Sequence, residues 1–565
     1  MPGDSTDFVY LGESRPLLVR LHVQIDGKSM VASWEDSIKE IFKYLDRNGD
    51  GVLSKEEAEK TPPAQVLLNP NALYGGISAP SMNQLDTNKD GKVTLQELTE
   101  YYRRSNGGPF HLQTGQNQAN VYYDVYGMQQ NVGNMSDQLN DAIFALLDTN
   151  KDGKLSREEL AAAPDKLLTV DADEDEMVTM EELLPNLAQY GRRRVFVRPP
   201  RRQTTPTNSD FVMMGAGDAP AKLTRQLLSR YGSKSGAASA ESLTRKQIGL
   251  EQAAFDELDL DRNGVLDVKE LERFARRAPD LELLIRHGRG RSSGPLEVLS
   301  PKGKQGLGSS MKADRGGYLL DLGNTRLELR GGGNSGGRAS PANLRSQYVM
   351  QFKNLDTKKK GYLEQKDVRT SPFFANSFKM MDLNNDGKLT EKEVVEFITK
   401  ITALQNKAMT SCASLTVSDE GRGIFDLIDT SKDGRLSVRE MRNAYKLIDQ
   451  LDRDHDGQIS RSEIPRSYLL VFSEGATPNT QNFGRVRAIQ YGGQNQRRPT
   501  LSAGPLWFRK MDSNRDGDVS RKEFLGTDEE FARIDTDGDG LISLQEAEAF
   551  DKLMRAQKVT VTRSK

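Results

Sequence analysis

Acidic residues recur in this chain at one fixed spacing, and that spacing decides what chemistry they can perform. In the stretch that begins at Asp46, oxygen-bearing side chains stand at positions one, three and five, a glycine at position six and a glutamate at position twelve. Alternate residues of a tight loop can direct oxygens at one centre, and a hard divalent cation takes six to eight oxygen ligands. Gly51 allows the sharp turn because it lacks a Cβ. The spacing therefore predicts a cation-binding loop that Glu57 closes with both carboxylate oxygens.

The same pattern is repeated along the whole chain. Eight loops match it at every position, and they begin at Asp46, Asp86, Asp148, Asp259, Asp382, Asp452, Asp512 and Asp535. A ninth loop, from Asp429, departs from it only by having Ser431 at position three. Because so long a pattern is specific, we expect nine good cation sites.

Two further loops depart from the pattern at positions that matter for a cation. The loop from Asp171 has acids at its ligand positions but Glu176 in place of the glycine, so Glu176 must adopt a positive φ or the loop must distort. The sequence leaves open whether this loop binds an ion. The loop from Asp356 has Lys358 and Lys360 at ligand positions, where two ammonium groups would repel a cation. We expect that loop to serve only as the structural partner of the good loop that follows it.

These eleven loops resemble the EF-hand of the calmodulin superfamily, and the chain as a whole is most similar to the multi-EF-hand proteins of bacteria. The resemblance covers the loops and their flanks, about half of the chain, and implies helix–loop–helix units that bind Ca²⁺. The side-chain and carbonyl ligands are expected at positions one, three, five, seven and twelve of ten loops: Asp46, Asn48, Asp50, Val52, Glu57, Asp86, Asn88, Asp90, Lys92, Glu97, Asp148, Asn150, Asp152, Lys154, Glu159, Asp171, Asp173, Asp175, Met177, Glu182, Asp259, Asp261, Asn263, Val265, Glu270, Asp382, Asn384, Asp386, Lys388, Glu393, Asp429, Ser431, Asp433, Arg435, Glu440, Asp452, Asp454, Asp456, Gln458, Glu463, Asp512, Asn514, Asp516, Asp518, Glu523, Asp535, Asp537, Asp539, Leu541 and Glu546.

The distances between loop starts sort the loops into expected pairs. The pairs are 46–57 with 86–97, 148–159 with 171–182, 356–367 with 382–393, 429–440 with 452–463, and 512–523 with 535–546. Three of these pairs leave only eleven residues between their loops, too few for two full helices. Gly526 and the capping box that starts at Thr527 mark the break in one connection, and Pro164 marks it in another. The loop from Asp259 has no visible partner.

Strand patterns lie between the loops. Apolar residues alternate over 17–25, and shorter alternations over 280–331 predict a small β-meander, while Val195 and Val197 suggest a third isolated piece. The predicted fold class is mainly α, with tandem EF-hand pairs, short β segments and the β-meander insert joined by flexible linkers. Along the chain we predict an N-terminal strand plus an EF-hand pair at 1–106, a pair at 107–198, a linker at 199–220, a single EF-hand at 221–279, the β-meander at 280–331, a Gly-rich linker at 332–345, two pairs at 346–473, a linker at 474–500 and a last pair at 501–565.

Composition excludes several other classes of protein. The 565 residues carry 79 Lys and Arg against 81 Asp and Glu, a net charge of −2, which argues against binding nucleic acid by bulk charge. The arginine run at 192–194 is better explained as a solvated linker than as an anionic-surface site. Cys412 is the single cysteine, so no internal disulfide can form, and four histidines complete no zinc framework.

No apolar stretch is long enough to span a membrane. The N-terminus lacks the regions of a secretory signal, and the compartment stays open, including export from a start upstream.

The sequence therefore predicts a calcium-binding protein of nine or ten sites and no enzymatic activity. Clustered carboxylates repel one another until a cation arrives, so we expect loose apo pairs and rigid calcium-bound pairs. The expected partners are calcium ions and an unknown protein, with no nucleic acid and no membrane span. A buffer or structural role fits the number of loops and the short connections. A sensor that exposes a partner-binding surface and a calcium-stiffened adhesion scaffold both remain as alternatives.

Overall fold

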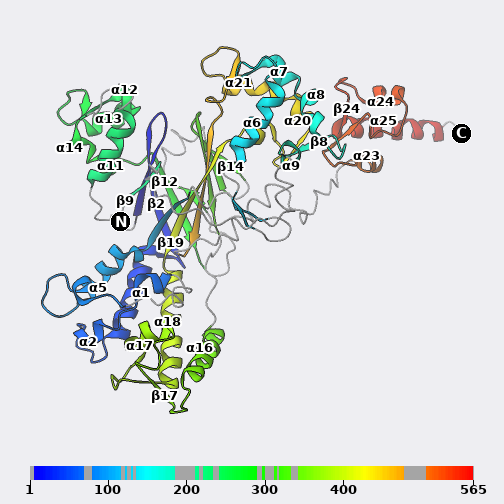
Figure 1. The fold of residues 1–565 in the computed structure, drawn as a ribbon. Coiled ribbons are helices and arrows are strands. Elements are labelled where there is room, and N and C mark those ends of the chain that lie inside the picture. The colour runs from blue at the N-terminus through cyan, green and yellow to red at the C-terminus, as the bar shows by residue number, and fades with distance from the viewer. Residues whose placement is uncertain are drawn as a thin grey trace. The chain divides into compact units, whose positions relative to one another are not determined.

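The computed structural model describes most of the chain (Figure 1). The described residues are 5–68, 79–115, 121–123, 129–131, 135–184, 210–214, 220–232, 241–288, 296–299, 311–314, 317–332, 341–475 and 504–563. The strand expected at Val195 and Val197 lies outside them, as do the arginine run and most of the expected linkers. The chain divides into two compact units, each of which is assembled from three separate stretches.

The first unit contains two six-stranded sheets. One sheet has the order β13 (Leu296–Val298), β12 (Leu281–His287), β2 (Pro16–Ile25), β1 (Ser5–Leu11) and β9 (Phe211–Met214), with β3 (Lys28–Ser29) also paired to β2. The other has the order β14 (Met311–Asp314), β15 (Gly317–Asp321), β16 (Thr325–Gly331), β22 (Arg466–Glu474), β19 (Ala413–Arg422) and β4 (Phe110–Gly115). Inward residues of both sheets form one buried cluster, in which Val19 and Leu283 accompany Leu327 and Leu415. The two sheets therefore make a β-sandwich.

The sandwich corrects the predicted β-meander at 280–331. Strand β12 pairs in parallel with β2, so that Leu283 lies opposite Leu21, whereas β14, β15 and β16 belong to the other sheet. The strand expected over 17–25 is confirmed as β2. The mainly-α fold class is only partly correct, because helical EF-hands are attached to a substantial all-β body. The reason is that residues far apart in the chain complete each sheet, which local alternation cannot reveal.

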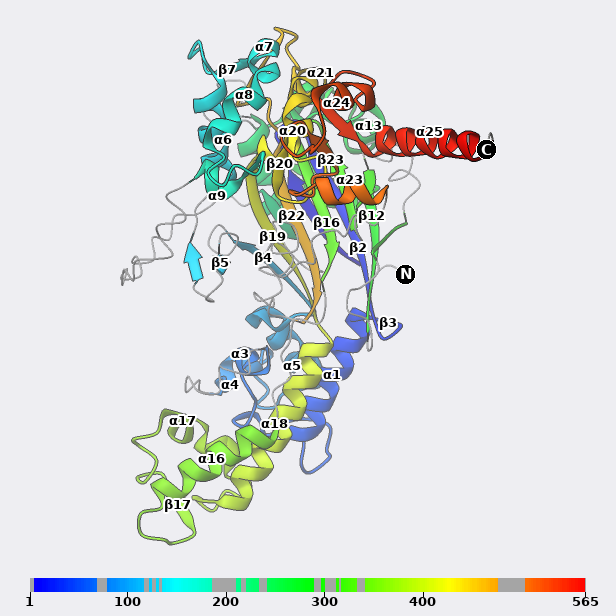
Figure 2. The ribbon, with the colours of Figure 1, turned by 90° about the vertical axis from the view of Figure 1, so that its right-hand side faces the viewer.

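A first lobe of helices also belongs to this unit and combines two pairs of loops around one core. Its elements are α1 (Met30–Leu45), α2 (Lys55–Ala58), α3 (Ala64–Leu68), α4 (Met82–Leu85), α5 (Leu95–Tyr102), α16 (Pro341–Leu355), β17 (Tyr362–Glu364), α17 (Pro372–Met381), β18 (Lys388–Thr390) and α18 (Glu391–Thr410). Figure 2 shows α1 and α18 side by side. The expected pairs are confirmed here, because Leu53 bridges Val93 and β17 pairs with β18. Trp34 and Tyr348 lie in the same buried cluster, so both pairs share one core.

A second lobe, in the other unit, combines the loops that begin at 148, 171, 429 and 452. Its elements are α6 (Met135–Leu147), β7 (Lys154–Ser156), α7 (Arg157–Ala161), α8 (Ala163–Leu167), η3 (Leu168–Val170), β8 (Met177–Thr179), α9 (Met180–Leu183), α19 (Phe425–Ile428), β20 (Arg435–Ser437), α20 (Val438–Arg442), η8 (Ala444–Leu447), α21 (Ile448–Leu451) and β21 (Gln458–Ser460). Strand β7 pairs with β21, and β8 pairs with β20. The expected pairs at 107–198 and 429–463 are therefore wrong, because each loop pairs with one from the distant segment.

The connections explain this exchange of partners. In the second lobe the eleven residues between neighbouring loops fold into two or three short helical segments, such as α7, α8 and η3. These segments form the exit helix of one hand and the entry helix of the next. In the C-terminal pair, with α23 (Leu506–Met511), β23 (Asp518–Ser520), α24 (Asp528–Ile534), β24 (Leu541–Ser543) and α25 (Leu544–Arg563), the same eleven residues hold a single helix. The second loop of this pair therefore lies beside the first, and β23 pairs with β24 as expected.

The loop from Asp259 pairs with a neighbouring segment that the sequence pattern did not predict. Strand β11 (Val265–Leu266) pairs with β10 (Leu243–Thr244), which runs into α12 (Arg245–Ile248). Thr244 and Gln247 form a capping box at the start of that helix, as the residues at positions nine and twelve do in the ion-binding loops. The predicted single EF-hand at 221–279 is therefore paired with a half-hand that lacks the acidic positions.

Candidate calcium sites

The loops share one set of internal hydrogen bonds that fixes the first acid. The backbone N–H at position six donates to the Oδ2 of the aspartate at position one, as from Gly51 to Asp46 over 3.1 Å and from Gly540 to Asp535 over 2.9 Å. Position six has a positive φ, +82° at Gly51, which a glycine adopts at little cost. The turn thus holds the first carboxylate at the centre of the loop.

The glutamate at position twelve is held from both sides. Oε1 of Glu463 accepts from the backbone N–H of Arg453 over 2.8 Å, and its Oε2 accepts from the N–H and the Oγ–H of Ser460, each over 2.8 Å. This carboxylate lies at the start of the exit segment and faces back into the loop. Burial raises the pKa of Glu463, but the hydrogen bonds from Ser460 and Arg453 outweigh it and lower the pKa. The acid is therefore kept ionised and correctly oriented for a cation.

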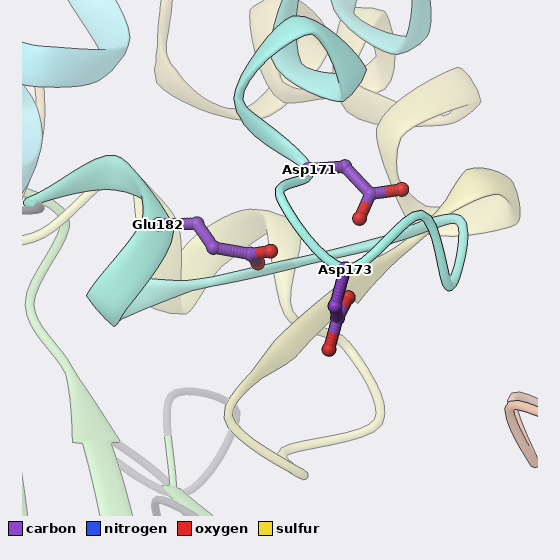
Figure 3. A group of neighbouring side chains, drawn as sticks. All are labelled: Asp171, Asp173 and Glu182. Atoms are coloured by element: carbon purple, nitrogen blue, oxygen red, sulfur yellow. The ribbon is translucent and has the colours of Figure 1, made fainter.

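Carboxylate oxygens converge in four loops. In each of these groups one oxygen per residue lies within 4.8 Å of the others, and the groups are Asp171, Asp173 and Glu182; Asp259, Asp261 and Glu270; Asp452, Asp454 and Glu463; and Asp535, Asp537 and Asp539. Figure 3 shows the first group, with the three side chains directed toward a common space inside the loop. Such a set of oxygens is the donor chemistry that Ca²⁺ prefers.

The loop from Asp171 keeps this geometry in spite of its substitution. Glu176 adopts a φ of +62°, as the sequence requires if the loop is not to distort. Its backbone N–H donates to Asp171 Oδ2 over 2.9 Å, the same bond that the glycine makes elsewhere. The unfavourable side chain is therefore accommodated without loss of the ligand arrangement.

Two loops present buried acid oxygens that need a partner. Oδ1 of Asp382 and Oδ1 of Asp512 are buried without a hydrogen-bond partner among the described residues. Burial raises the pKa of Asp512 to about 6 and that of Asp516 to about 7, and it raises the pKa of Asp429 to about 6. Burying carboxylates in this way is costly unless a cation or donor compensates. The donor set therefore fits a divalent ion.

The loop from Asp356 is neutralised from within. The Nζ of Lys360, at position five, lies 2.8 Å from Asp367 Oδ2 and 3.6 Å from Glu364 Oε2. The ammonium group also lies 4.9 Å from the ring of Tyr362. A lysine thus occupies the position where a calcium ligand would stand, and the absence of ion binding at this loop stays a prediction.

The remaining expected ligands lie in their loops, with polar side chains bonded to one another. At position three, the Nδ2 of Asn48 donates to Asp50 Oδ2 over 3.0 Å, and Asn384 and Asp386 are arranged in the same way. Lys154 of loop 148–159 was expected to supply a backbone carbonyl. Its ammonium group forms an ion pair with Asp456 of the partner loop 452–463.

Other residues that the sequence singled out lie away from this chemistry. His455, one of the four histidines, is exposed at position four of its loop. Cys412 is buried, and burial raises the pKa of its thiol to about 12. The sequence pattern did not reveal the arginines of α20 that contact the C-terminal pair, because nothing local relates them to those loops.

Comparisons with known proteins agree with this geometry. The family model of the EF-hand domain pair matches residues 79–163 and 374–446, and that of the single EF hand matches 38–57, 250–275, 445–465, 506–525 and 528–550. The probable calcium-binding protein CML16 of Oryza sativa subsp. japonica is 30% identical over 104 residues, which are 18% of this chain and 55% of that protein. Polcalcin Nic t 2 of Nicotiana tabacum is 36% identical over 67 residues, which are 12% of this chain and 72% of that protein.

The chain thus spans about half the length of the rice relative. No solved structure matches the chain at a significant level. Among the described residues, no helix is both long enough and apolar enough to cross a bilayer. The converging carboxylates, the family models and the relatives agree on the bound ion, which is Ca²⁺. The chain belongs to the EF-hand family of calcium-binding proteins.

Proposed function

We propose that this chain binds calcium through ten of its eleven loops and that the ions stabilise the packing within each helical lobe, a structural role without enzymatic activity. The convergence of carboxylate oxygens within 4.8 Å in four loops carries the proposal. The loop from Asp171 counts among the ten, because its acids converge in spite of Glu176. The loop from Asp356 does not, because Lys360 neutralises it.

The chain path favours a structural role over a simple buffer. Loop 148–159 is joined through β7 to β21 of loop 452–463, about 300 residues later in the chain. Loop 171–182 is joined in the same way to loop 429–440. A buffer needs only local pairs, whereas here each ladder closes a long stretch of chain. Ions bound to these loops would remove the repulsion between acids and so stabilise the joining of distant segments.

A sensor role is a second candidate, and the C-terminal pair favours it. Leu506, Leu525 and Leu553 are 61%, 86% and 62% exposed. Trp507 and Phe550 pack beside the small core of this pair. Exposed apolar side chains next to an aromatic cluster are typical of a surface that receives a partner. The first lobe presents fewer such side chains, with Met350 the exposed one among its described residues.

Calcium titration calorimetry of the chelator-stripped full chain, with circular dichroism on the same samples, tests the proposal. We expect about ten ions bound, a gain of helical signal and a higher unfolding temperature. The same titration with magnesium serves as the control, since Mg²⁺ demands a smaller octahedral site. Fewer than about five ions, or an unfolding temperature that stays constant or falls, would contradict a structural role. Binding of a hydrophobic dye that rises with calcium would favour the sensor instead.

A further inference from the structure

The C-terminal pair is attached to the second lobe by its own calcium loops. Leu541, at position seven of loop 535–546, is 2% exposed and belongs to the buried cluster of the second lobe rather than to the core of its own pair. A Cβ added at Gly540 would lie 3.5 Å from the guanidinium of Arg442 in α20. Figure 1 accordingly places β24 beside α20 and β8.

Arginines of the second lobe face the acids of this pair. Arg439 makes a bidentate ion pair with Asp518, with Nε–Oδ2 and Nη2–Oδ1 distances of 2.6 and 3.0 Å, and the Asp518 side chain is only 8% exposed. Nη1 of the same guanidinium lies 3.5 Å from Oδ2 of Asp539. Arg442 donates to the backbone carbonyl of Asp539, and Arg435 donates to that of Asn514 over 3.3 Å.

Loop 171–182 supplies a second set of contacts. Nδ2 of Asn514 donates to the backbone carbonyl of Asp175 over 2.9 Å, and Nζ of Lys522 donates to that of Glu174 over 2.7 Å. The residues that meet here have different roles toward an ion. Asp539 and Asn514 stand at ligand positions, whereas position seven, where Asp518 stands, supplies a backbone carbonyl.

We propose that α20 is an internal docking site for the C-terminal pair and that docking and calcium occupancy of loop 535–546 oppose each other. This inference rests on the proposed function, because it assumes that the loop binds calcium. Asp518 anchors the pair through a side chain that is no ligand. Arg439 and Arg442 place positive charge beside Asp539, where an ion would also bring positive charge, and like charges at such distances repel. Because coupling is reciprocal, if docking lowers the affinity of the loop for calcium, then bound calcium must lower the stability of docking by the same factor.

Hydrogen exchange of the full chain, followed by mass spectrometry over a calcium titration, tests this coupling. In the double variant Arg439→Gln, Arg442→Gln, we expect peptides of loop 535–546 to become protected at a three- to tenfold lower free calcium concentration. In the absence of calcium, the same variant should exchange faster over 174–182. Arg157→Gln is the matched control, because it removes a lobe arginine whose partner is the exposed Asp449. It should change neither quantity.

Asp518→Asn gives an independent measurement, since it weakens the anchor without removing a ligand side chain. We expect faster exchange over 174–182 without calcium, and again a lower calcium midpoint for loop 535–546. An unchanged or higher midpoint in both variants would overturn the coupling. If instead the wild type shows no calcium-dependent protection in any loop, the proposed function itself fails, which is a distinguishable result. Calcium-dependent protection that is intact in all variants but never shifted would refute this inference alone.

Discussion

The exchanged pairing of the second lobe predicts which loop responds when another is disabled. Substitution of Glu463 by glutamine removes the charged ligand at position twelve of loop 452–463 while it keeps the shape of the side chain. Glu463 accepts three hydrogen bonds, from Arg453 and from the N–H and hydroxyl of Ser460. Glutamine has one acceptor oxygen, so at least one of these bonds is lost. A hydrogen bond to a charged group contributes about 1.5–3 kcal/mol.

This loss sets the expected size of the effect. At about 1.4 kcal/mol for each factor of ten, loop 452–463 should bind calcium about 10- to 100-fold more weakly. The partner on β7 should respond as well, because Leu155 and Ile459 are both fully buried where the strands pair. Coupling between sites is typically about 1–3 kcal/mol. Loop 148–159 should therefore shift by about fivefold or more.

Hydrogen exchange over a calcium titration measures each loop through its own peptides. In Glu463→Gln we expect the midpoint for 148–159 to move more than that for 429–440, although 429–440 is the neighbour in sequence. The matched variant Glu182→Gln should give the opposite outcome, with 429–440 moving more than 148–159. If each variant instead affects its sequence neighbour most, the exchanged ladders do not exist in solution and the reasoning fails.

Three further predictions concern one loop that lacks ligands and two single residues. Replacing Lys358 and Lys360 by aspartate, together with Asp367→Glu, should add one calcium ion to the calorimetric stoichiometry; an unchanged number would show that the ammonium groups are not the obstacle. Glu176→Gly relieves a left-handed backbone conformation that is unfavourable for a residue with a Cβ. The free energy of unfolding of the calcium-free second lobe, measured in urea, should therefore rise by about 1 kcal/mol. A decrease would contradict the presence of strain at Glu176. Burial lowers the pKa of His287 from 6.5 to about 4. Between pH 6.5 and 4 the unfolded chain binds this proton and the folded chain does not. The free energy of unfolding should therefore fall by about 3 kcal/mol as the pH is lowered over this range. In His287→Leu, thermal unfolding at each pH should show a weaker dependence of stability on pH.

The geometry of the loops could be predicted from the sequence because each loop is local. Twelve consecutive residues contain the ligands, the turn and the cap, as in the loop from Asp452 to Glu463. For Glu176 the pattern predicted either a positive φ or a distorted loop, and the structure has the positive φ. The neutralising role of Lys360 was evident from charge alone, although its partner Asp367 became clear only from the 2.8 Å distance.

The pairing of loops and the sandwich could not be predicted in the same way. Start-to-start distances are equal in the second lobe and in the C-terminal pair, but their ladders differ. The sandwich is built from strands such as β2 and β12, which pair although more than 250 residues separate them, and β4 and β19, which pair across about 300 residues. The apolar run of β22 (Arg466–Glu474) and the alternation in β19 were not recognised, because β22 closely follows an EF-hand loop and β19 lies between the helices α18 and α19 of two EF-hands. Each sheet is thus specified by pairing between distant segments, which the hydrophobic periodicity of a single segment does not reveal.

The two degenerate hands show which constraint the fold retains when ion binding is absent. The half-hand at β10 keeps the buried Leu243 opposite Leu266 and the capping box of Thr244 and Gln247, but it has no acidic positions. The loop from Asp356 likewise keeps Leu363 opposite Leu389 while a lysine replaces a ligand. In both, the strand ladder and its apolar contacts persist without the carboxylates. Pairing is therefore a packing requirement of each hand, whereas ion binding belongs to single loops. Calcium should therefore order most strongly the second lobe and the C-terminal pair, where both loops of each ladder carry acids.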